Sequence, residues 1–405
     1  MTEGILRRDD LDESMNDINL DEWKNLVVLC AANRYDGIKL ADQHVAQQLA
    51  QLTPVLYVDP TVSFAKVLSA RQNPWSQSRL RILGPGLARL TPVVQPFPSR
   101  KGMTWLTSIL ALRLLRRATR RLGGDVQAVL SAWPLVPILG GCGERVKVYW
   151  AQDDFVGGAE LLGLNPEVLR TGESQTAAAA DFIIAANPGV AKTWRDRGYQ
   201  PILIPFGADV ASYEGIDRLS PAADVDLPAP IAGFIGHINE RINLELLEAV
   251  ALRGRSMLLI GPRRAAYEPA RWNALLKRSN VRWLGPKQYE ELPAYLKAID
   301  VGLVPYGDSA FNRGSFPLKT FEYLAAGRPV VATSLPATRW LATDLVTMAD
   351  EPTAFADAVD RWLFEPRTKA AMDARRAFAG RHSWAQRAKQ IADVLAARST
   401  PQIAT

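Results

Sequence analysis

A chain of 405 residues is longer than one ordinary hydrophobic core supports, so we expect two domains of roughly 200 residues each. Hydrophobic residues make up 48% of the chain and charged residues 22%, a globular composition that excludes a largely disordered protein. The net charge of +6 would suit nucleic acid, but no nucleic-acid motif with interleaved aromatic residues accompanies the basic residues. We therefore expect no nucleic-acid partner.

The chain begins with a polar and acidic stretch, residues 1–22, which lacks the basic and apolar regions of a secretory signal and predicts a disordered or loosely docked leader. The apolar runs that follow have the length of strands and fall well below the roughly 20 residues of a membrane-spanning helix. The cysteines, Cys30 and Cys142, provide neither a disulfide framework nor a metal-binding spacing. We therefore expect a cytoplasmic protein.

Short apolar runs rich in β-branched residues alternate with helical patterns from residue 23 to residue 216. The runs are 26–32, 55–59, 128–133, 147–152, 182–186 and 202–206. Such alternation predicts βαβ units around a mostly parallel sheet, and hence an N-terminal Rossmann-like domain over 23–216.

Residues 217–230 interrupt this alternation with three prolines and three aspartates, and we expect them to form a linker. A second series of apolar runs follows at 231–235, 257–260, 281–284, 301–305 and 329–333. It predicts a C-terminal doubly wound domain over 231–382. Because ligands of such sheets lie beyond the carboxyl ends of the strands, two domains of this kind facing each other predict a cleft whose chemistry lies in strand-to-helix loops.

The pattern over 383–398 predicts a last helix with Ser383 as its N-cap. Its apolar face is formed by Trp384, Ala388, Ile391, Ala392 and Leu395. Two arrangements stay open: the helix completes the C-terminal domain, or it crosses back to the N-terminal domain.

A basic amphipathic helix is predicted over 105–122. Its five arginines are Arg113, Arg116, Arg117, Arg120 and Arg121, and its other side is expected to hold Trp105, Leu106, Ile109, Leu112 and Leu115. This pattern suits an anionic membrane surface, where lipid-linked acceptors reside. The alternative is a helix packed on the core with a solvated basic face.

The most informative segment is 312–333, NRGSFPLKTFEYLAAGRPVVAT, in which a loop leads into a short helix, a glycine stop and a buried strand. It resembles the donor-site signature of the retaining glycosyltransferases of family 4, which are also described as bacterial glycosyl transferases group 1 and have the GT-B fold. The resemblance implies that Glu322 binds the ribose hydroxyls of a nucleotide. It also implies that backbone amides around Leu318 and Lys319, at a helix N-terminus, hold the diphosphate without a metal ion. On its own, a glutamate in an amphipathic helix is more often a solvated surface residue.

The segment 233–247, GFIGHINERINLELL, resembles the first strand and phosphate loop of the family's donor domain. The family typically has a Gly-Arg-Leu turn there, followed by a lysine that contacts the diphosphate. In this sequence Gly236 is followed by His237 in the place of the arginine, and Arg241 is the candidate for the role of the lysine. Arginine can bind phosphate oxygens in a bidentate manner, although a solvated cation at the start of a helix is the alternative. Arg263 either reaches a phosphate or faces water.

The N-terminal half carries the residues that the resemblance assigns to the acceptor side. The segment 147–155, KVYWAQDDF, is similar to a subgroup with paired aspartates after a strand, so Asp153 and Asp154 could bind sugar hydroxyls or cap a helix. His44, in a helical pattern after the loop that contains Gly37, is similar to a histidine near the acceptor. A structural role for His44 is the alternative.

The sequence departs from the family pattern at Gly314. The family has two glutamates eight positions apart, and the first, which usually contacts the transferred sugar, would fall at this glycine. Asn312 or Ser315 could offer hydrogen bonds instead. No enzymic nucleophile is evident, which fits retaining members of the family. In these, catalysis depends on positioning of the donor, here by Glu322, and on stabilisation of charge on the departing phosphate, here by Arg241.

Together these features predict a GT-B glycosyltransferase of the hexosyltransferase type. It would move a sugar from a nucleotide-sugar donor to a glycan or lipid-linked acceptor with retention of configuration, in cell-envelope polysaccharide biosynthesis at the inner face of the membrane. We expect no metal ion and no other cofactor. The alternatives are a nucleotide-sugar epimerase of the same fold, which needs acid and base groups around the sugar, and a noncatalytic nucleotide-sugar-binding protein.

Overall fold

The computed structural model describes residues 19–37, 39–69, 80–97 and 102–399. Most of the predicted leader lies outside these residues. The chain divides into two compact units, of which the first comprises Met1–Tyr149, Thr171–Asp181 and Ala392–Thr405 and the second comprises Trp150–Arg170 and Phe182–Ile391. The predicted linker at 217–230 therefore falls inside the second unit.

An eight-stranded sheet is formed by the N-terminal half of the chain, in the order β10-β9-β8-β7-β1-β2-β5-β4. Its strands are β1 (Leu26–Cys30), β2 (Val55–Val58), β4 (Arg81–Gly84), β5 (Leu87–Leu90), β7 (Val126–Ser131), β8 (Val146–Ala151), β9 (Phe182–Ala185) and β10 (Ile202–Leu203). The central pairings of β1 with β2 and β7 are parallel, as predicted, whereas the edge pair β4–β5 is antiparallel. A separate two-stranded sheet joins β3 (Val62–Ser63) to β6 (Val93–Val94).

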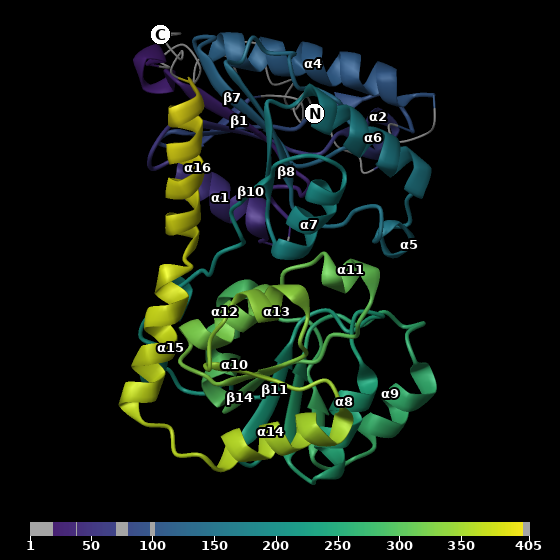
Figure 1. Cartoon of the computed structure of the whole chain (residues 1–405), viewed down its shortest axis with the longest axis vertical. Helices are drawn as coiled ribbons and strands as arrows, with labels where there is room; N and C mark the ends of the chain where they lie inside the picture. Colours follow the sequence, from purple (N-terminus) through teal and green to yellow (C-terminus); the bar gives the residue numbers. More distant parts are fainter. Residues whose placement is uncertain (1–18, 38, 70–79, 98–101, 400–405) are drawn as a thin grey trace, which may run out of the picture. The chain divides into compact units, whose positions relative to one another are not determined.

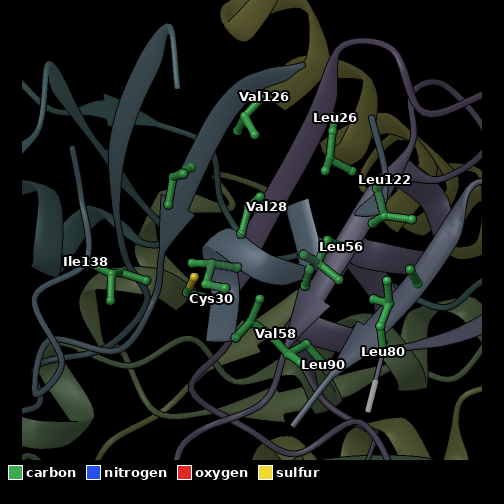
Figure 2. Packing of buried hydrophobic residues seen from close by; sticks show 14 of the residues in the cluster. Leu26, Val28, Cys30, Leu56, Val58, Leu80, Leu90, Leu122, Val126 and Ile138 are labelled. Atoms are coloured by element: carbon green, nitrogen blue, oxygen red, sulfur yellow. The ribbon is translucent and has the colours of Figure 1, made fainter. Parts of the chain in front are cut away.

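The core of the first unit forms where α4 (Thr104–Arg121) packs on this sheet. Every residue of β1 is buried, as its continuous run of apolar side chains requires of a central parallel strand. Figure 2 shows Val28 and Cys30 of β1 beside Leu56 and Val58 of β2, in the same buried cluster as Leu115 of α4. Complete burial stabilises each such aliphatic side chain by about 1.5–3 kcal/mol.

A six-stranded parallel sheet is formed within the second unit, in the order β13-β12-β11-β14-β15-β16. Its strands are β11 (Ile231–Ile235), β12 (Ser256–Ile260), β13 (Val281–Trp283), β14 (Val301–Val304), β15 (Val330–Ala332) and β16 (Val346–Met348). The helices that follow the strands include α8 (Leu244–Leu252), α9 (Pro269–Leu276), α10 (Leu292–Ala298), α12 (Leu318–Ala325), α13 (Pro336–Trp340) and α14 (Pro352–Phe364) (Figure 1). This sheet confirms the predicted doubly wound fold.

The strand order of this sheet reverses between β11 and β14. From β11 the chain continues outward to β12 and β13, and from β14 it continues in the opposite direction to β15 and β16. Such a switch point separates the loops at the carboxyl ends of its two strands and is where open α/β sheets bind ligands. The loops after β11 and β14 are therefore the first place to look for a site.

The remaining helices are α1 (Ala41–Leu49), α2 (Phe64–Ser69), α5 (Ala159–Leu162), α6 (Pro166–Ala179), α7 (Pro188–Asp196), α11 (Ala310–Arg313), α15 (Lys369–Arg381) and α16 (Trp384–Ser399). The predicted last helix corresponds to α16, and the Ser383 hydroxyl accepts a hydrogen bond from the Gln386 amide in its first turn. The end of this helix belongs to the first unit, where Gln127 Nε2 donates to Ser399 Oγ.

Candidate functional site

Three segments of the second unit meet at Gly236, the first residue after β11. A Cβ atom at Gly236 would lie 2.0 Å from Lys319 Cε, and a Cβ atom at Gly261, the first residue after β12, would lie 2.0 Å from the Gly236 carbonyl oxygen. Only glycine fits at either position without displacing its neighbours. The aliphatic stem of Lys319 therefore crosses directly over the loop after β11.

Arg241 lies in that loop and is held by the loop after β14. Its Nε donates to Asn312 Oδ1 at 2.9 Å and its Nη2 donates to Ser315 Oγ at 2.8 Å. The guanidinium also lies 4.8 Å from the ring centre of Tyr306 and 5.0 Å from that of Phe311, distances typical of cation–π contacts. Two hydrogen bonds and two aromatic faces thus fix the orientation of the guanidinium.

Asn312 is buried and connects the two loops. Its Nδ2 donates to the carbonyl oxygens of Arg241, at 2.9 Å, and of Gly307, at 2.8 Å. The sequence suggested Asn312 and Ser315 as hydrogen-bonding groups for a sugar. In the structure both oxygens accept hydrogen bonds from Arg241, and a contact of either residue with a sugar stays a prediction.

Helix α12 brings two more predicted residues to the same place. No side chain caps its N-terminus, so the amides of Leu318 and Lys319 have no acceptor within the helix. Within α12, the ring of Phe321 stacks on Phe316, with ring centres 5.3 Å apart, and on His382, with ring centres 5.1 Å apart. The partly buried N-terminus of this helix therefore offers uncapped N–H groups beside the Lys319 ammonium, an arrangement that favours anions.

Glu322 lies one turn further along α12 and is partly buried. Its carboxylate forms no hydrogen bond or ion pair with the described residues. Burial raises its pKa above the ordinary value, Lys319 lowers it, and Asp209 raises it further. An unpaired, partly desolvated carboxylate is costly in the ligand-free protein, which is a feature of binding sites more than of structural positions.

Asp209 and two tyrosines surround Glu322. Asp209 Oδ2 accepts hydrogen bonds from Ser212 Oγ, at 2.7 Å, and from the Tyr289 hydroxyl, at 2.9 Å. Glu322 in turn contributes to the raised pKa values of Tyr289 and of buried Tyr213, for which burial is the main cause. No local pattern indicates these neighbours of Glu322, because they come from segments more than 30 residues away in the chain.

His237 and Arg263 lie in the loops after β11 and β12. Partial burial, followed by the charges of Lys319 and Arg241, lowers the pKa of His237 below its ordinary value and favours the neutral imidazole. Arg263 Nη2 donates to the Tyr267 carbonyl oxygen at 2.7 Å, and its guanidinium lies 5.4 Å from the Trp272 ring centre. The proposed phosphate contact of Arg263 stays a prediction.

The residues expected on the acceptor side lie in both units. In the first unit, His44 is buried on α1 and Gly37 lies in the preceding loop, where its amide donates to the Arg34 carbonyl oxygen. In the second unit, Asp153 and Asp154 follow β8, and Asp154 Oδ1 accepts a hydrogen bond from the Gly157 amide at 2.8 Å. Their acceptor-side role stays a prediction.

The structure thus brings seven of the predicted residues to one end of the six-stranded sheet: Gly236, His237, Arg241, Ser315, Leu318, Lys319 and Glu322. Within residues 19–37, 39–69, 80–97 and 102–399, no three or more His, Cys, Asp or Glu side chains are grouped so that they could hold a metal ion. Among the helices that the structure describes, none is both long enough and apolar enough to span a membrane.

Two Rossmann-like, mainly parallel sheets in one chain are the architecture of the GT-B class of fold. Sucrose-phosphate synthase from Thermosynechococcus elongatus has this architecture, with a TM-score of 0.70 over 92% of this chain and 98% of that one, at 16% identity. Anabaena Alr3699/HepE, solved in complex with UDP and glucose, gives a TM-score of 0.64 over 92% of this chain and 99% of that one, at 15% identity.

Residues 229–365, which include the seven site residues from Gly236 to Glu322, match the family described as Glycosyl transferases group 1. The TuaH protein of Bacillus subtilis (strain 168), whose name places it among the glycosyltransferases of teichuronic acid biosynthesis, is 35% identical over 159 residues. That alignment covers 38% of this chain and 40% of TuaH, so the chain spans less than half of this relative.

Proposed function

We propose that the protein is a glycosyltransferase that moves a sugar from a nucleotide-sugar donor to an acceptor with retention of configuration. The observation that carries this proposal is the order of charges along α12: Lys319 and the uncapped amides lie at one end, beside Arg241, and Glu322 lies one turn further on. The cationic end suits the diphosphate and the carboxylate suits the ribose hydroxyls. Alr3699/HepE, which shares the fold, was solved with UDP and glucose.

The geometry accounts for the chemistry without an enzymic nucleophile. The bond between the anomeric carbon and the diphosphate oxygen breaks, and negative charge grows on the departing diphosphate. Arg241, Lys319 and the α12 N-terminus stabilise this charge more strongly in the transition state than in the bound donor. The acceptor hydroxyl forms the new bond on the same face of the sugar and passes its proton to the diphosphate, so the products are the glycosylated acceptor and a nucleoside diphosphate.

A thermal-shift screen against UDP, GDP, ADP and dTDP tests donor binding. At a concentration of about 100 times its Kd, the matching diphosphate adds about 2.7 kcal/mol of stability, which raises Tm by roughly 5–10 °C. Because we propose that helix amides and cations bind the diphosphate, the shift should persist in EDTA. The absence of a shift with any nucleotide contradicts the proposal, and a shift that requires a divalent ion contradicts its metal-free form.

Product analysis by NMR separates transfer from the alternatives. Transfer requires an acceptor and gives a glycoside with the anomeric configuration of the donor. Conversion of the donor to its epimer without an acceptor would identify an epimerase. Binding without turnover of any donor and acceptor pair would identify a noncatalytic protein.

We propose a glycan or lipid-linked acceptor in cell-envelope polysaccharide assembly, which the name of TuaH supports. Helix α4 supports a location of the protein at the inner face of a membrane. Trp105 is 63% exposed and Ile109 is 36% exposed, so both lie on the side of the arginines and not on the opposite side as the sequence suggested. At about 100° per residue, these two side chains and the five arginines fall within roughly half of the helix circumference.

The other half of α4 packs on the core through Ala111, Leu115 and Ala118. A groove of about 500 Å³ on the exposed half is lined by Arg113, Arg116, Arg117, Arg120 and Arg121. None of these arginines forms an ion pair with the described residues. An uncompensated basic face beside an exposed tryptophan suits anionic lipid, at about 1 kcal/mol per arginine near the surface.

Replacing the five α4 arginines by glutamine should abolish binding to anionic vesicles. Wild type should co-sediment with them at about 0.01 M salt and remain in the supernatant at about 1 M salt, because salt screens the attraction. A matched control replaces five exposed arginines of the second unit, Arg253, Arg264, Arg278, Arg361 and Arg381, and changes the net charge of +6 by the same amount. Equal sedimentation of both variants, or no sedimentation of wild type, would show that α4 is only a core helix with a solvated face.

A further inference from the structure

The segment around Gly314, which follows α11, packs tightly on the loop after β8 within the second unit. A Cβ atom at Gly314 would lie 2.6 Å from Asp154 Cβ. A Cβ atom at Gly158 would lie 2.5 Å from the Phe311 ring, and one at Gly189 would lie 2.1 Å from the Arg313 carbonyl oxygen. Three glycines thus allow a close approach that any side chain would prevent.

A buried asparagine holds the same contact in place. Asn187 Nδ2 donates to the Gly314 carbonyl oxygen at 2.6 Å, and Asn187 Oδ1 accepts from the Val190 amide at 2.8 Å at the start of α7. Asn187 is 0% exposed, so these bonds form away from water, where a broken bond is costly. The position of Gly314 against Asp154 is therefore fixed by backbone and buried side chains together.

Asp154 has one carboxylate oxygen available. Oδ1 accepts from the Gly157 amide, whereas Oδ2 accepts no hydrogen bond from the described residues. A Cβ atom at Gly157 would lie 2.5 Å from Oδ2, so the glycine leaves this oxygen uncovered on that side. The turn therefore orients the carboxylate while it leaves an acceptor for a ligand.

Gly314 lies between Asn312 and Ser315, the two residues that hold Arg241. The carboxylate of Asp154 therefore packs on the same segment that holds Arg241, the proposed partner of the diphosphate to which the sugar is attached. We infer that Asp154 binds hydroxyl groups of the transferred sugar, in place of the carboxylate that position 314 lacks. This inference rests on the proposed transfer function and assigns Asp154 to the donor, not to the acceptor side.

The substitution Asp154→Asn tests the inference with little disturbance of the turn, because the amide oxygen can still accept from Gly157. Loss of a charge-assisted hydrogen bond should lower kcat/KM for the sugar donor by about tenfold to hundredfold, with the Kd of the nucleoside diphosphate nearly unchanged. Asp196→Asn, at the exposed end of α7, is the matched control and should behave as wild type. If Asp154 only stabilises the turn, the Asp154→Asn variant also transfers at the wild-type rate, and the inference is wrong.

Moving the carboxylate from position 154 to position 314 provides a second test. Gly314→Glu alone should impair transfer because its side chain meets Asp154, and Asp154→Gly alone should impair it because the carboxylate is lost. The double variant has room for the glutamate and should recover at least about tenfold in kcat/KM over Asp154→Gly. No recovery in a double variant that still binds the nucleoside diphosphate overturns the inference. If wild type binds no nucleoside diphosphate, the proposed function fails first and the inference falls with it.

Discussion

Arg241→Ala is expected to lower kcat for sugar transfer by about 10²–10³-fold, while the Kd of the nucleoside diphosphate rises by no more than about tenfold. The difference arises because Arg241 is proposed to stabilise charge that grows on the diphosphate as the glycosidic bond breaks. Steady-state kinetics and calorimetry on the same preparation measure the two effects separately.

Arg253→Ala is a suitable control, because Arg253 follows α8 at the end opposite to Arg241 and forms an exposed ion pair with Asp357. Arg241→Lys should give an intermediate rate, since an ammonium cannot bond Asn312 and Ser315 in the manner of the planar guanidinium. A loss of nucleotide affinity with kcat unchanged in Arg241→Ala would instead indicate uniform binding and reject a transition-state role.

The buried parallel strands could be predicted from the sequence because burial on both faces leaves a continuous apolar run. All five residues of β1 and all five of β11 are buried. The antiparallel hairpin of β4 and β5 could not be found in this way. Three of the four β4 residues are exposed, so this edge strand has no apolar run to recognise.

The resemblance predicted which residues gather at the switch point but not how they are held. Arg241 and Glu322 could be named because each lies in a locally characteristic segment. Asn312 and Ser315 were suggested as hydrogen-bonding groups, but their contact with Arg241 was not, because Asn312 lies 71 positions from Arg241 and the contact forms only when β11 and β14 become neighbours. The proximity of Asp154 and Gly314 has the same origin, since nothing near either residue indicates the other.

Helix α4 shows a different limit of sequence analysis. An apolar residue on an amphipathic pattern is expected to face the core, and this holds for Leu115. Trp105 and Ile109 lie near the start of the helix, on the exposed side with the arginines. The pattern predicted a helix with two faces, but the assignment of these two residues to the buried face was wrong.

Glu322→Ala is expected to weaken binding of the nucleoside diphosphate by about 1.5–3 kcal/mol, or roughly tenfold to 150-fold in Kd. The loss comes from the charge-assisted hydrogen bonds that the carboxylate is proposed to accept from the ribose hydroxyls. Glu365→Gln, at an exposed position after α14, serves as the control. An unchanged Kd would reject the assignment of Glu322 to the ribose.

Glu322→Gln should have the opposite effect on the ligand-free protein and raise its Tm at pH 8. Burial raises the pKa of Glu322 in the folded state, so the folded protein binds this proton more tightly than the unfolded chain does. The ionised carboxylate therefore destabilises the folded state at pH values above the raised pKa. This penalty disappears as the pH falls through the raised pKa towards the ordinary value, and the Tm values of wild type and variant should then converge.

Thermal unfolding between pH 4 and pH 8, with and without the nucleoside diphosphate, measures both effects in one series. Without nucleotide the glutamine variant should be the more stable protein at pH 8, and with saturating nucleotide the order should reverse, because wild type gains the larger binding energy. This reversal is expected of a carboxylate that binds a ligand but destabilises the ligand-free protein. A structural glutamate would lower Tm on substitution under both conditions, and a solvated one would change neither.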